Sequence, residues 1–169
     1  MNARNGSSWL HTLSQRLPLL GHRNWIVIAD AAYPLQTAPG IETIVADTDL
    51  TTALKAALGE IEAAPHVRPV VHLDAELDFV TDADAPGAEA LRAALREALD
   101  GQQTVRLPHE EIIAKLDAAG RSFNILLIKT RETIPYTSVF IELDCGYWNA
   151  RAESALRQAM AGSPLTSNA

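Results

Sequence analysis

The sequence predicts an α/β protein, specifically a three-layer α/β/α sandwich around a largely parallel, mixed central sheet. Residues 25–29 form an uninterrupted apolar run, Trp-Ile-Val-Ile-Ala, which is typical of a strand buried on both faces. Apolar residues recur at helical spacing within 50–63, and again between Gly87 and Asp100. Because strands and helices alternate along most of the chain, we expect helices to cover both faces of one sheet.

The first third of the chain is expected to contain two helices and two strands. Ser7 or Ser8 is placed to cap a helix that ends near Pro18. After the strand described above, a loop with several prolines leads to a second strand, predicted over 41–46. Asp49 then precedes the second helix, where an aspartate side chain accepts hydrogen bonds from free backbone N–H groups.

The middle of the chain gives a less regular pattern. Pro65 and Pro69 are expected to bracket a turn before a strand over 70–73. Residues 74–84 are acidic, and their first half alternates polar and apolar side chains as a strand does, while their second half is typical of a loop. Both assignments remain open for this segment.

The last third carries two strong strand signals, at 124–129 and 138–143. They are preceded by a short strand at 104–107 and a helix that starts at Pro108-His109 and stops at Gly120. Because the two strong strands are joined closely, they are expected to run antiparallel. A final helix is predicted over 150–160.

Length and charge restrict the class of protein. The 169 residues suit one domain spanning 1–169, with a helical extension at 1–17 and a flexible tail at 162–169. The net charge of −7 and the lack of any Lys/Arg run argue against a nucleic-acid partner. No apolar stretch approaches the length needed to cross a bilayer, so no membrane partner is expected.

The single cysteine, Cys145, cannot form an intrachain disulfide. A reducing, cytoplasmic location is therefore expected, in agreement with an N-terminus that lacks a secretion-signal pattern. Cys145 itself is expected to be a small core residue, because buried cysteine is common and inert.

Several sequence signatures of cofactor and metal sites are absent. The chain has no Gly-x-Gly-x-x-Gly after the first strand, no Gly-x-x-x-x-Gly-Lys-Ser/Thr loop and no Gly-x-Ser-x-Gly elbow. Its five histidines do not follow the spacing of a metal-binding motif. We therefore expect no metal site and no cofactor.

The remaining polar residues that suit catalysis lie at strand ends and turns. His22 precedes the first strand and Asp30 follows it, at the loop positions where chemistry is often found in α/β proteins. His109 begins a helix, and a turn before the last strand holds Glu132, Tyr136 and Ser138. Each residue taken singly also has an ordinary structural role, such as a turn histidine or a helix-capping aspartate.

The order of these residues is more specific than any one of them. Gly21-His22, a strand, Asp30-Ala31 and Pro34 together resemble the first active-site segment of the D-ribose pyranase / L-fucose mutarotase family. His109-Glu110, a strand, the turn 132–136, another strand and Gly146 follow the order of that family's C-terminal segment. The resemblance covers most of residues 17–148.

The chain departs from the family pattern at three positions. Asn24 stands where relatives commonly carry aspartate, and Arg131 stands where they usually have glycine. Ser138 replaces an asparagine, whose amide offers a sugar hydroxyl both a donor and an acceptor.

The resemblance implies a cofactor-independent isomerase that interconverts the anomers or ring forms of a monosaccharide. His22 is then the general acid/base, since the histidine side chain, with an unperturbed pKa of about 6.5, is suited as a residue type to proton transfer near neutrality. Asp30 orients that imidazole or binds a sugar hydroxyl. The other substrate-binding groups implied are His109, Glu132, Tyr136, Ser138 and the backbone of Thr137.

The resemblance also implies a ring-shaped homo-oligomer, decamer-like as in the family, with sites at subunit contacts. Trp9, Tyr147 and Trp148 are compatible with such a contact. Three other interpretations remain open: a non-catalytic sugar-binding or regulatory protein that keeps the fold, a purely structural oligomer, and a metal-dependent hydrolase.

Overall fold

The computed structural model describes residues 6–162, so 1–5 and the expected tail from 163 onward lie outside the described residues. Its centre is a six-stranded sheet with the order β2-β5-β1-β6-β3-β4, in which only β6 runs antiparallel to its neighbours. The expected mixed, largely parallel sheet is therefore confirmed. The strands are β1 (Trp25–Ala29), β2 (Ile41–Val45), β3 (Val67–Asp74), β4 (Thr104–Leu107), β5 (Ile125–Lys129) and β6 (Val139–Cys145).

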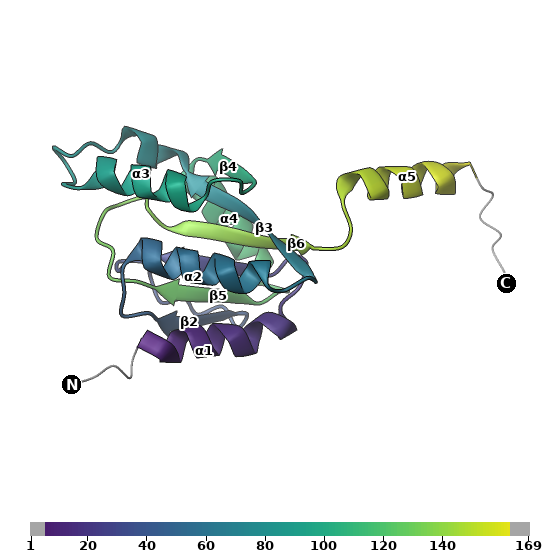
Figure 1. Cartoon of the computed structure of the whole chain (residues 1–169), viewed down its shortest axis with the longest axis horizontal. Coiled ribbons are helices and arrows are strands. Elements are labelled where there is room, and N and C mark those ends of the chain that lie inside the picture. The colour runs from purple at the N-terminus through teal and green to yellow at the C-terminus, as the bar shows by residue number, and fades with distance from the viewer. Residues whose placement is uncertain (1–5, 163–169) are drawn as a thin grey trace.

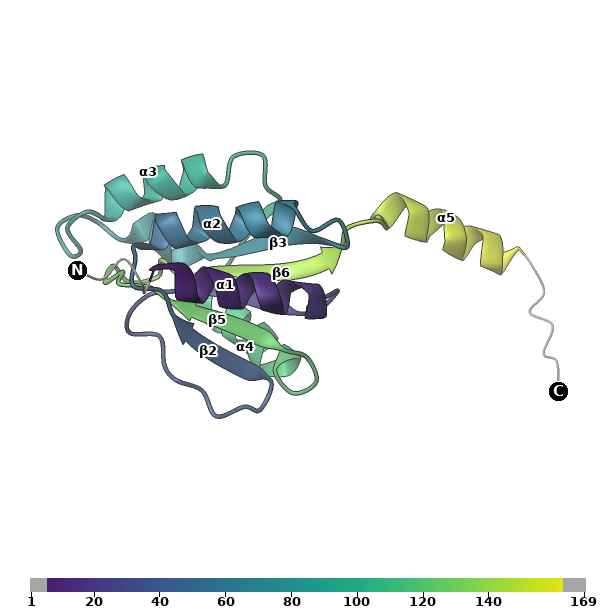
Figure 2. The ribbon, with the colours of Figure 1, turned by 60° about the horizontal axis from the view of Figure 1, so that its bottom comes forward.

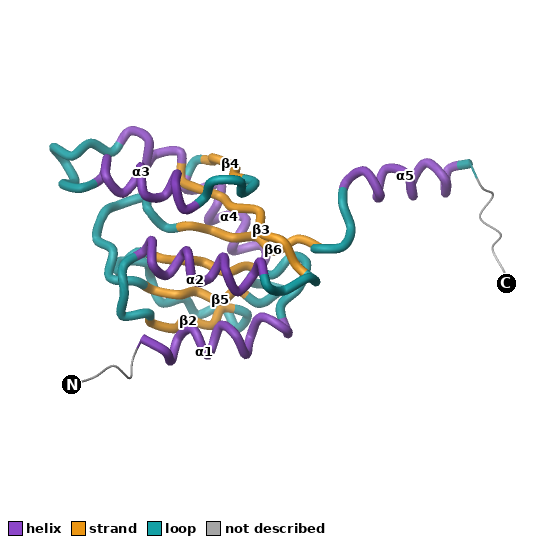
Figure 3. The backbone as a smooth tube through the Cα atoms, in the orientation of Figure 1, coloured by secondary structure: helices purple, strands orange, loops and turns teal. Residues whose placement is uncertain are grey.

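The helices form two layers around this sheet. Figures 1 and 2 show α1, α2 and α3 on one face and α4 on the other, while α5 extends away from the body. The same three layers are visible in the tube of Figure 3. The helices are α1 (Gly6–Arg16), α2 (Leu50–Glu62), α3 (Ala88–Ala98), α4 (His109–Ala119) and α5 (Ala150–Ala161), with 3-10 turns η1 (Leu17–Leu19) and η2 (Ala75–Phe79).

The predicted central strand is buried on both faces. All five residues of β1 are buried, because alternate side chains enter two different cores. Ile26 and Ile28 pack with α1, α2 and α3, whereas Val27 packs with Ile112 and Leu116 of α4. The continuous apolar run in the sequence is the direct consequence of this double burial.

Local signals placed most element boundaries correctly. Asp49 caps α2 as expected, since its carboxylate accepts the backbone N–H of Thr52 at 2.8 Å. Hydrogen bonds from the Thr52 side chain and backbone, and from Thr51, lower the pKa of Asp49 to about 2. At the N-terminus, α1 begins at Gly6, before either serine that was expected to cap it.

In the middle of the chain, one expectation was wrong, and the structure decides the assignment that the sequence left open. β3 begins at Val67 and contains Pro69, which pairs with Leu143 of β6. Proline is tolerated there because β4 pairs with β3 only from Val71 onward, so position 69 has a free edge. The alternating segment after Asp74 forms the 3-10 turn η2 and no strand.

β5 and β6 run in opposite directions, as expected, and β1 lies between them in the sheet. Two other expectations differ from the structure. Cys145 is only partly buried at the end of β6. Trp9 is buried in the chain's own core at 5% exposure, so it is not available for a subunit contact.

Strand direction gives the sheet two chemically different edges. β1 and β3 end at one edge, where β6 begins; we call it the carboxyl edge. At the opposite edge, β1 and β3 begin and β6 ends; we call it the amino edge. Loops at the ends of strands are held by the rigid sheet, so both edges are suitable places for a site.

Candidate functional site at the carboxyl edge

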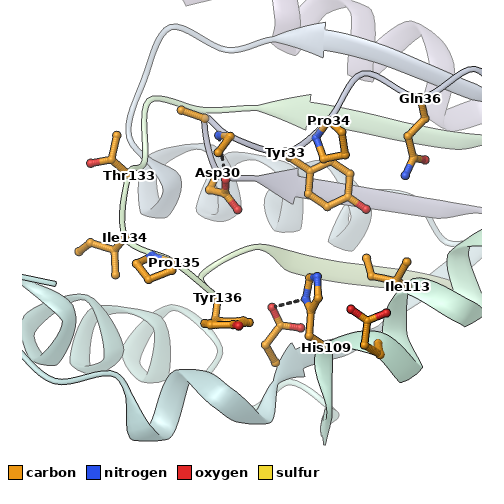
Figure 4. A pocket seen from close by; sticks show the side chains of 14 residues that line it. Asp30, Tyr33, Pro34, Gln36, His109, Ile113, Thr133, Ile134, Pro135 and Tyr136 are labelled. Carbon is orange, nitrogen blue, oxygen red and sulfur yellow. Dashed lines mark hydrogen bonds and ion pairs between the residues drawn. The ribbon is translucent and has the colours of Figure 1, made fainter. Parts of the chain in front are cut away.

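A pocket of about 690 Å³ opens at the carboxyl edge. Figure 4 shows Asp30 and Tyr33 on one side of it, facing Tyr136 and His109 on the other. Its remaining lining residues come from the loop after β1, the ends of β3 and α4, and the turn before β6: Ala31, Ala32, Pro34, Gln36, Asp74, Glu110, Ile113, Thr133, Ile134 and Pro135. Segments far apart in the sequence therefore meet in one cavity.

Asp30 is held in place by the start of β6. The hydroxyl of Ser138 donates to Asp30 Oδ2 at 2.8 Å and accepts the Asp30 backbone N–H at 3.1 Å. The Ala32 N–H donates to the other carboxylate oxygen at 2.9 Å. Ser138 is 2% exposed and does not line the pocket, so its side chain positions Asp30.

His109 forms a dyad with an aspartate that the sequence analysis did not single out. Its Nδ1 lies 3.0 Å from Oδ2 of Asp74, the last residue of β3. Its backbone N–H, the first of α4, donates to both carboxylate oxygens of Glu76 at 3.0 Å. With Nδ1 bonded to a carboxylate, Nε2 is left as the proton-exchanging atom of a partly exposed imidazole.

Asp74 is fully buried, and this changes its acidity. Burial raises the pKa of Asp74 to about 6, although the attraction of His109 works in the opposite direction. Its Oδ1 has no hydrogen-bond partner among the described residues. A buried oxygen of this kind is costly unless a polar group meets it, which makes it a natural contact for a hydroxyl in the pocket.

Tyr33 contributes a second buried oxygen without a partner in the described part of the chain. Burial, followed by the negative charges of Asp117, Asp74 and Asp30, raises the pKa of Tyr33 to about 12. The phenol is therefore neutral at ordinary pH and remains able to donate a hydrogen bond.

The turn before β6 presents Tyr136 to the pocket. Tyr136 has a φ of 59°, in the left-handed region. Its ring and the His109 ring are nearly perpendicular, with their centres 5.7 Å apart. Glu132 holds the turn, because its carboxylate accepts the N–H groups of Thr133 and Ile134, both at 2.9 Å. Thr137 is buried and its hydroxyl donates to the carbonyl of Ile134 at 2.7 Å. Neither Glu132 nor Thr137 lines the cavity.

His22 lies at the amino edge, separated from Asp30 by the length of β1, on the order of 20 Å. Its Nδ1 is 3.0 Å from Oδ1 of Asp144, near the end of β6. Burial tends to raise the pKa of Asp144, but the Cys145 N–H and the charge of Arg68 outweigh it and lower the pKa. Asp144 thus orients the imidazole in this chain, and the side chain of His22 is largely exposed.

The single chain therefore brings Asp30, His109 and Tyr136 together and leaves His22 at the opposite edge. Asp74 and Tyr33 belong to the pocket and were missed. A signal for Asp74 was present, since it is an acid at the end of an apolar strand, like Asp30. Within residues 6–162, no three His, Cys, Asp or Glu side chains gather as a metal site.

A family model described as the RbsD / FucU transport protein family matches residues 8–146, which include every residue of the pocket and His22. The chain belongs to this family. No curated protein sequence matches the chain. In the part of this RbsD / FucU member that the structure describes, no helix is long and apolar enough to cross a membrane.

Solved structures share the fold of this RbsD / FucU member. RbsD of Bacillus subtilis, complexed with D-ribose, is 24% identical with a TM-score of 0.56, over 79% of this chain and 91% of its own. The fucose mutarotase of Streptococcus pneumoniae, in complex with L-fucose, is 17% identical with a TM-score of 0.53, over 83% and 94%. FucU from Bifidobacterium longum is 17% identical with a TM-score of 0.53, over 79% and 94%.

Proposed function

We propose that the protein is a sugar mutarotase or pyranase that interconverts anomers or ring forms of a monosaccharide at the carboxyl-edge pocket. The observation that carries this proposal is the convergence of Asp30, Asp74, His109 and two tyrosines on one cavity. Family membership supports the same class, and two of the similar structures hold D-ribose and L-fucose. We place the reaction in the cytoplasm, on the basis of the single cysteine.

The pocket suits a neutral, hydroxyl-rich molecule. Asp30 and Asp74 offer carboxyl oxygens as acceptors, and Tyr33 offers a phenolic donor. Among the described residues, no lysine or arginine lines it, so a phosphorylated sugar would meet carboxylates without a compensating cation. A free monosaccharide therefore fits this lining better than a sugar phosphate does.

Ring opening requires two proton transfers. One group removes the proton of the anomeric hydroxyl as the carbonyl forms, and another protonates the ring oxygen as its bond to the anomeric carbon breaks. His109 is one such group, because Asp74 holds its Nδ1 and no hydrogen bond to its Nε2 is found among the described residues. Reclosure on the other face, or through another hydroxyl, gives the second anomer or ring size. No electrons leave the sugar.

We propose that His22 of a second copy is the other proton-transfer group. His22 has the same arrangement as His109, an imidazole whose Nδ1 is held by a carboxylate, but it lies on the opposite edge of the sheet. A head-to-tail contact between two copies brings the amino edge of one against the carboxyl edge of the next. Contacts of this heterologous type form a ring when the rotation between copies closes, and a ring is the assembly that the family resemblance implies.

The test is anomer exchange measured by saturation-transfer NMR on D-ribose, L-fucose and other aldoses. We expect His22→Ala and His109→Ala each to lower exchange by at least about a hundredfold, the scale of general acid–base catalysis. His11→Ala, which alters an exposed histidine on α1, is the control and should exchange sugars normally. No exchange by the unaltered protein on any aldose would overturn the enzymatic proposal.

Mixing the two inactive variants tests whether the site is shared. After dissociation and reassembly of equal amounts, about a quarter of the sites combine an intact His22 with an intact His109, if pairing is random. We therefore expect exchange to recover to about a quarter of the normal rate. No recovery, with assembly intact, would show that His22 and His109 do not act in one shared site.

The main competing function is sugar binding without turnover. It is favoured by one observation, that a single chain completes the pocket without His22. In that case ribose or fucose raises the melting temperature of the protein, but does not exchange, and His22→Ala leaves the sugar affinity unchanged.

A further inference from the structure

Helix α5 extends from the amino edge and does not join either core of the described residues. Figure 1 shows it clear of the body, and none of its residues is buried. The family model ends at residue 146, so Tyr147, Trp148 and α5 lie beyond the part that defines the family. A helix of this length is marginal in water by itself and ordinarily gains its stability from packing.

The exposed side of α5 is apolar along one stripe. Leu156 and Met160 are one turn apart and are 43% and 42% exposed. Alanines extend the same side of the helix: Ala152, Ala155 and Ala159. Just before the helix, Tyr147 is 78% exposed. Large apolar side chains gathered on one exposed segment are typical of a protein contact.

A groove of about 680 Å³ runs between α5 and the amino edge. His22, Arg23, Arg68 and Arg157 line it, against the acids Asp144 and Glu153. The pocket at the carboxyl edge has the opposite character. Within residues 6–162, its charged lining residues are Asp30, Asp74 and Glu110, with His109 and no arginine or lysine. The two edges of the sheet are therefore complementary in charge.

The same complementarity holds for the chain as a whole. From position 147 onward the sequence has two arginines and one glutamate, a net charge of +1. Because the whole chain has a net charge of −7, residues 1–146 have a net charge of −8. The carboxyl edge also exposes large apolar side chains of its own: Leu35, Phe79 and Tyr136. It offers α5 both apolar contact and charge attraction.

We propose that residues 147–161 are an arm that docks onto the carboxyl edge of a second copy of this chain. The arm lies beside the contact that brings His22 to the neighbour's pocket, and at about 18 Å its helix is long enough to reach past the rim of that pocket. This inference rests on the proposed function for the direction of the contact. It assigns to the arm a role in holding the copies together.

Two variants that add equal charge to opposite sides of α5 test the arm. In Leu156→Glu/Met160→Glu the apolar stripe is interrupted, whereas Ser154→Glu/Gln158→Glu alters the other side of the same helix. By sedimentation velocity we expect the first variant to self-associate at least about tenfold more weakly, with mass shifting toward the 18.3 kDa chain, and the second to match the unaltered protein. Equal association of all three proteins, or an unaltered protein that is monomeric, would overturn the proposal.

A cysteine pair tests where the arm docks. In a Cys145→Ser background, chains carrying Leu156→Cys are mixed with chains carrying Phe79→Cys and oxidised. We expect a disulfide between the two kinds of chain. Disulfides formed by Leu156→Cys chains alone would instead show that two arms pair with each other, and would overturn docking at the carboxyl edge.

Anomer exchange in the same samples separates this inference from the proposed function. If the apolar-stripe variant dissociates while the unaltered protein exchanges no sugar, the arm is supported and the enzymatic proposal fails. If that variant stays assembled and the unaltered protein exchanges sugar, the enzymatic proposal is supported and residues 147–161 do not hold the copies together.

Discussion

Asp74 gives the sharpest test of how the pocket is built. The carboxyl group is fully buried at the end of β3 and has His109 as its hydrogen-bond partner. Asp74→Asn keeps the size and the ability to bond to the imidazole, but removes the charge. Because the folded protein has to bury this charge, its removal should stabilise the fold while it disables the site.

The magnitude follows from the pKa. Burial raises the pKa of Asp74 from 3.8 to about 6 in the folded protein, even with His109 opposing the shift. At about 1.4 kcal/mol for each tenfold change in proton affinity, the rise corresponds to about 3 kcal/mol. Since the folded state holds the proton more tightly, stability is favoured below the unfolded pKa and is lost as pH rises toward 6.

Urea unfolding between pH 4 and pH 8, at one fixed protein concentration, measures the effect. Near pH 4, we expect the charge of Asp74 to make little difference between the free energies of unfolding of Asp74→Asn and the unaltered protein. Above pH 6 the variant should have gained about 3 kcal/mol relative to the unaltered protein, while losing anomer exchange. Asp47→Asn, at an exposed carboxylate, is the control. A difference between Asp74→Asn and the unaltered protein that does not change with pH would refute the reasoning.

Three further substitutions test how the scaffold supports the site. Ser138→Ala removes the two hydrogen bonds between Ser138 and Asp30, so we expect sugar affinity measured by calorimetry to fall about tenfold and stability to fall by about 1–3 kcal/mol. Gly40→Ala places a Cβ 2.6 Å from the Phe123 carbonyl oxygen and should lower the free energy of unfolding in urea by about 1–3 kcal/mol. Gly59→Ala is the control, because its Cβ meets nothing within 4 Å and should not destabilise the fold. Asp49→Ala removes the cap of α2 and should cost about 1 kcal/mol; no loss in a thermal melt would show that α2 does not depend on it.

The local features of the chain could be predicted from the sequence because they depend on residues that are neighbours along it. The apolar run of β1 predicts that the strand is buried, and Asp49 predicts where α2 begins. α4 begins at His109, immediately after the proline that predicts it. In contrast, Pro69 lies within β3 because the neighbouring strand β4 stops short of it, and sequence pattern does not report where a neighbour ends.

For the candidate site too, some residues could be selected from the sequence and others only from the structure. Family-like order along the sequence selected Asp30, His109 and Tyr136, and the structure places all three on one pocket. The same order also grouped His22 with them, although β1 separates it from Asp30 within a chain. Asp74 joined the site only because β3 lies beside β6, with its end at the same edge as the start of β6.

By itself, then, the sequence determined the fold class, nearly all of the helices and strands, and a set of residues with the chemistry for proton transfer. Only the tertiary structure decided which of those residues meet, that Asp74 and Tyr33 join them, and that no residue of α5 is buried against the described part of the chain. The physical reason is the separation along the chain between the residues that determine each feature. Periodicity, capping and strand burial are recorded in nearby residues, whereas the meeting of side chains depends on strand order and direction, which are set by packing across the whole sheet.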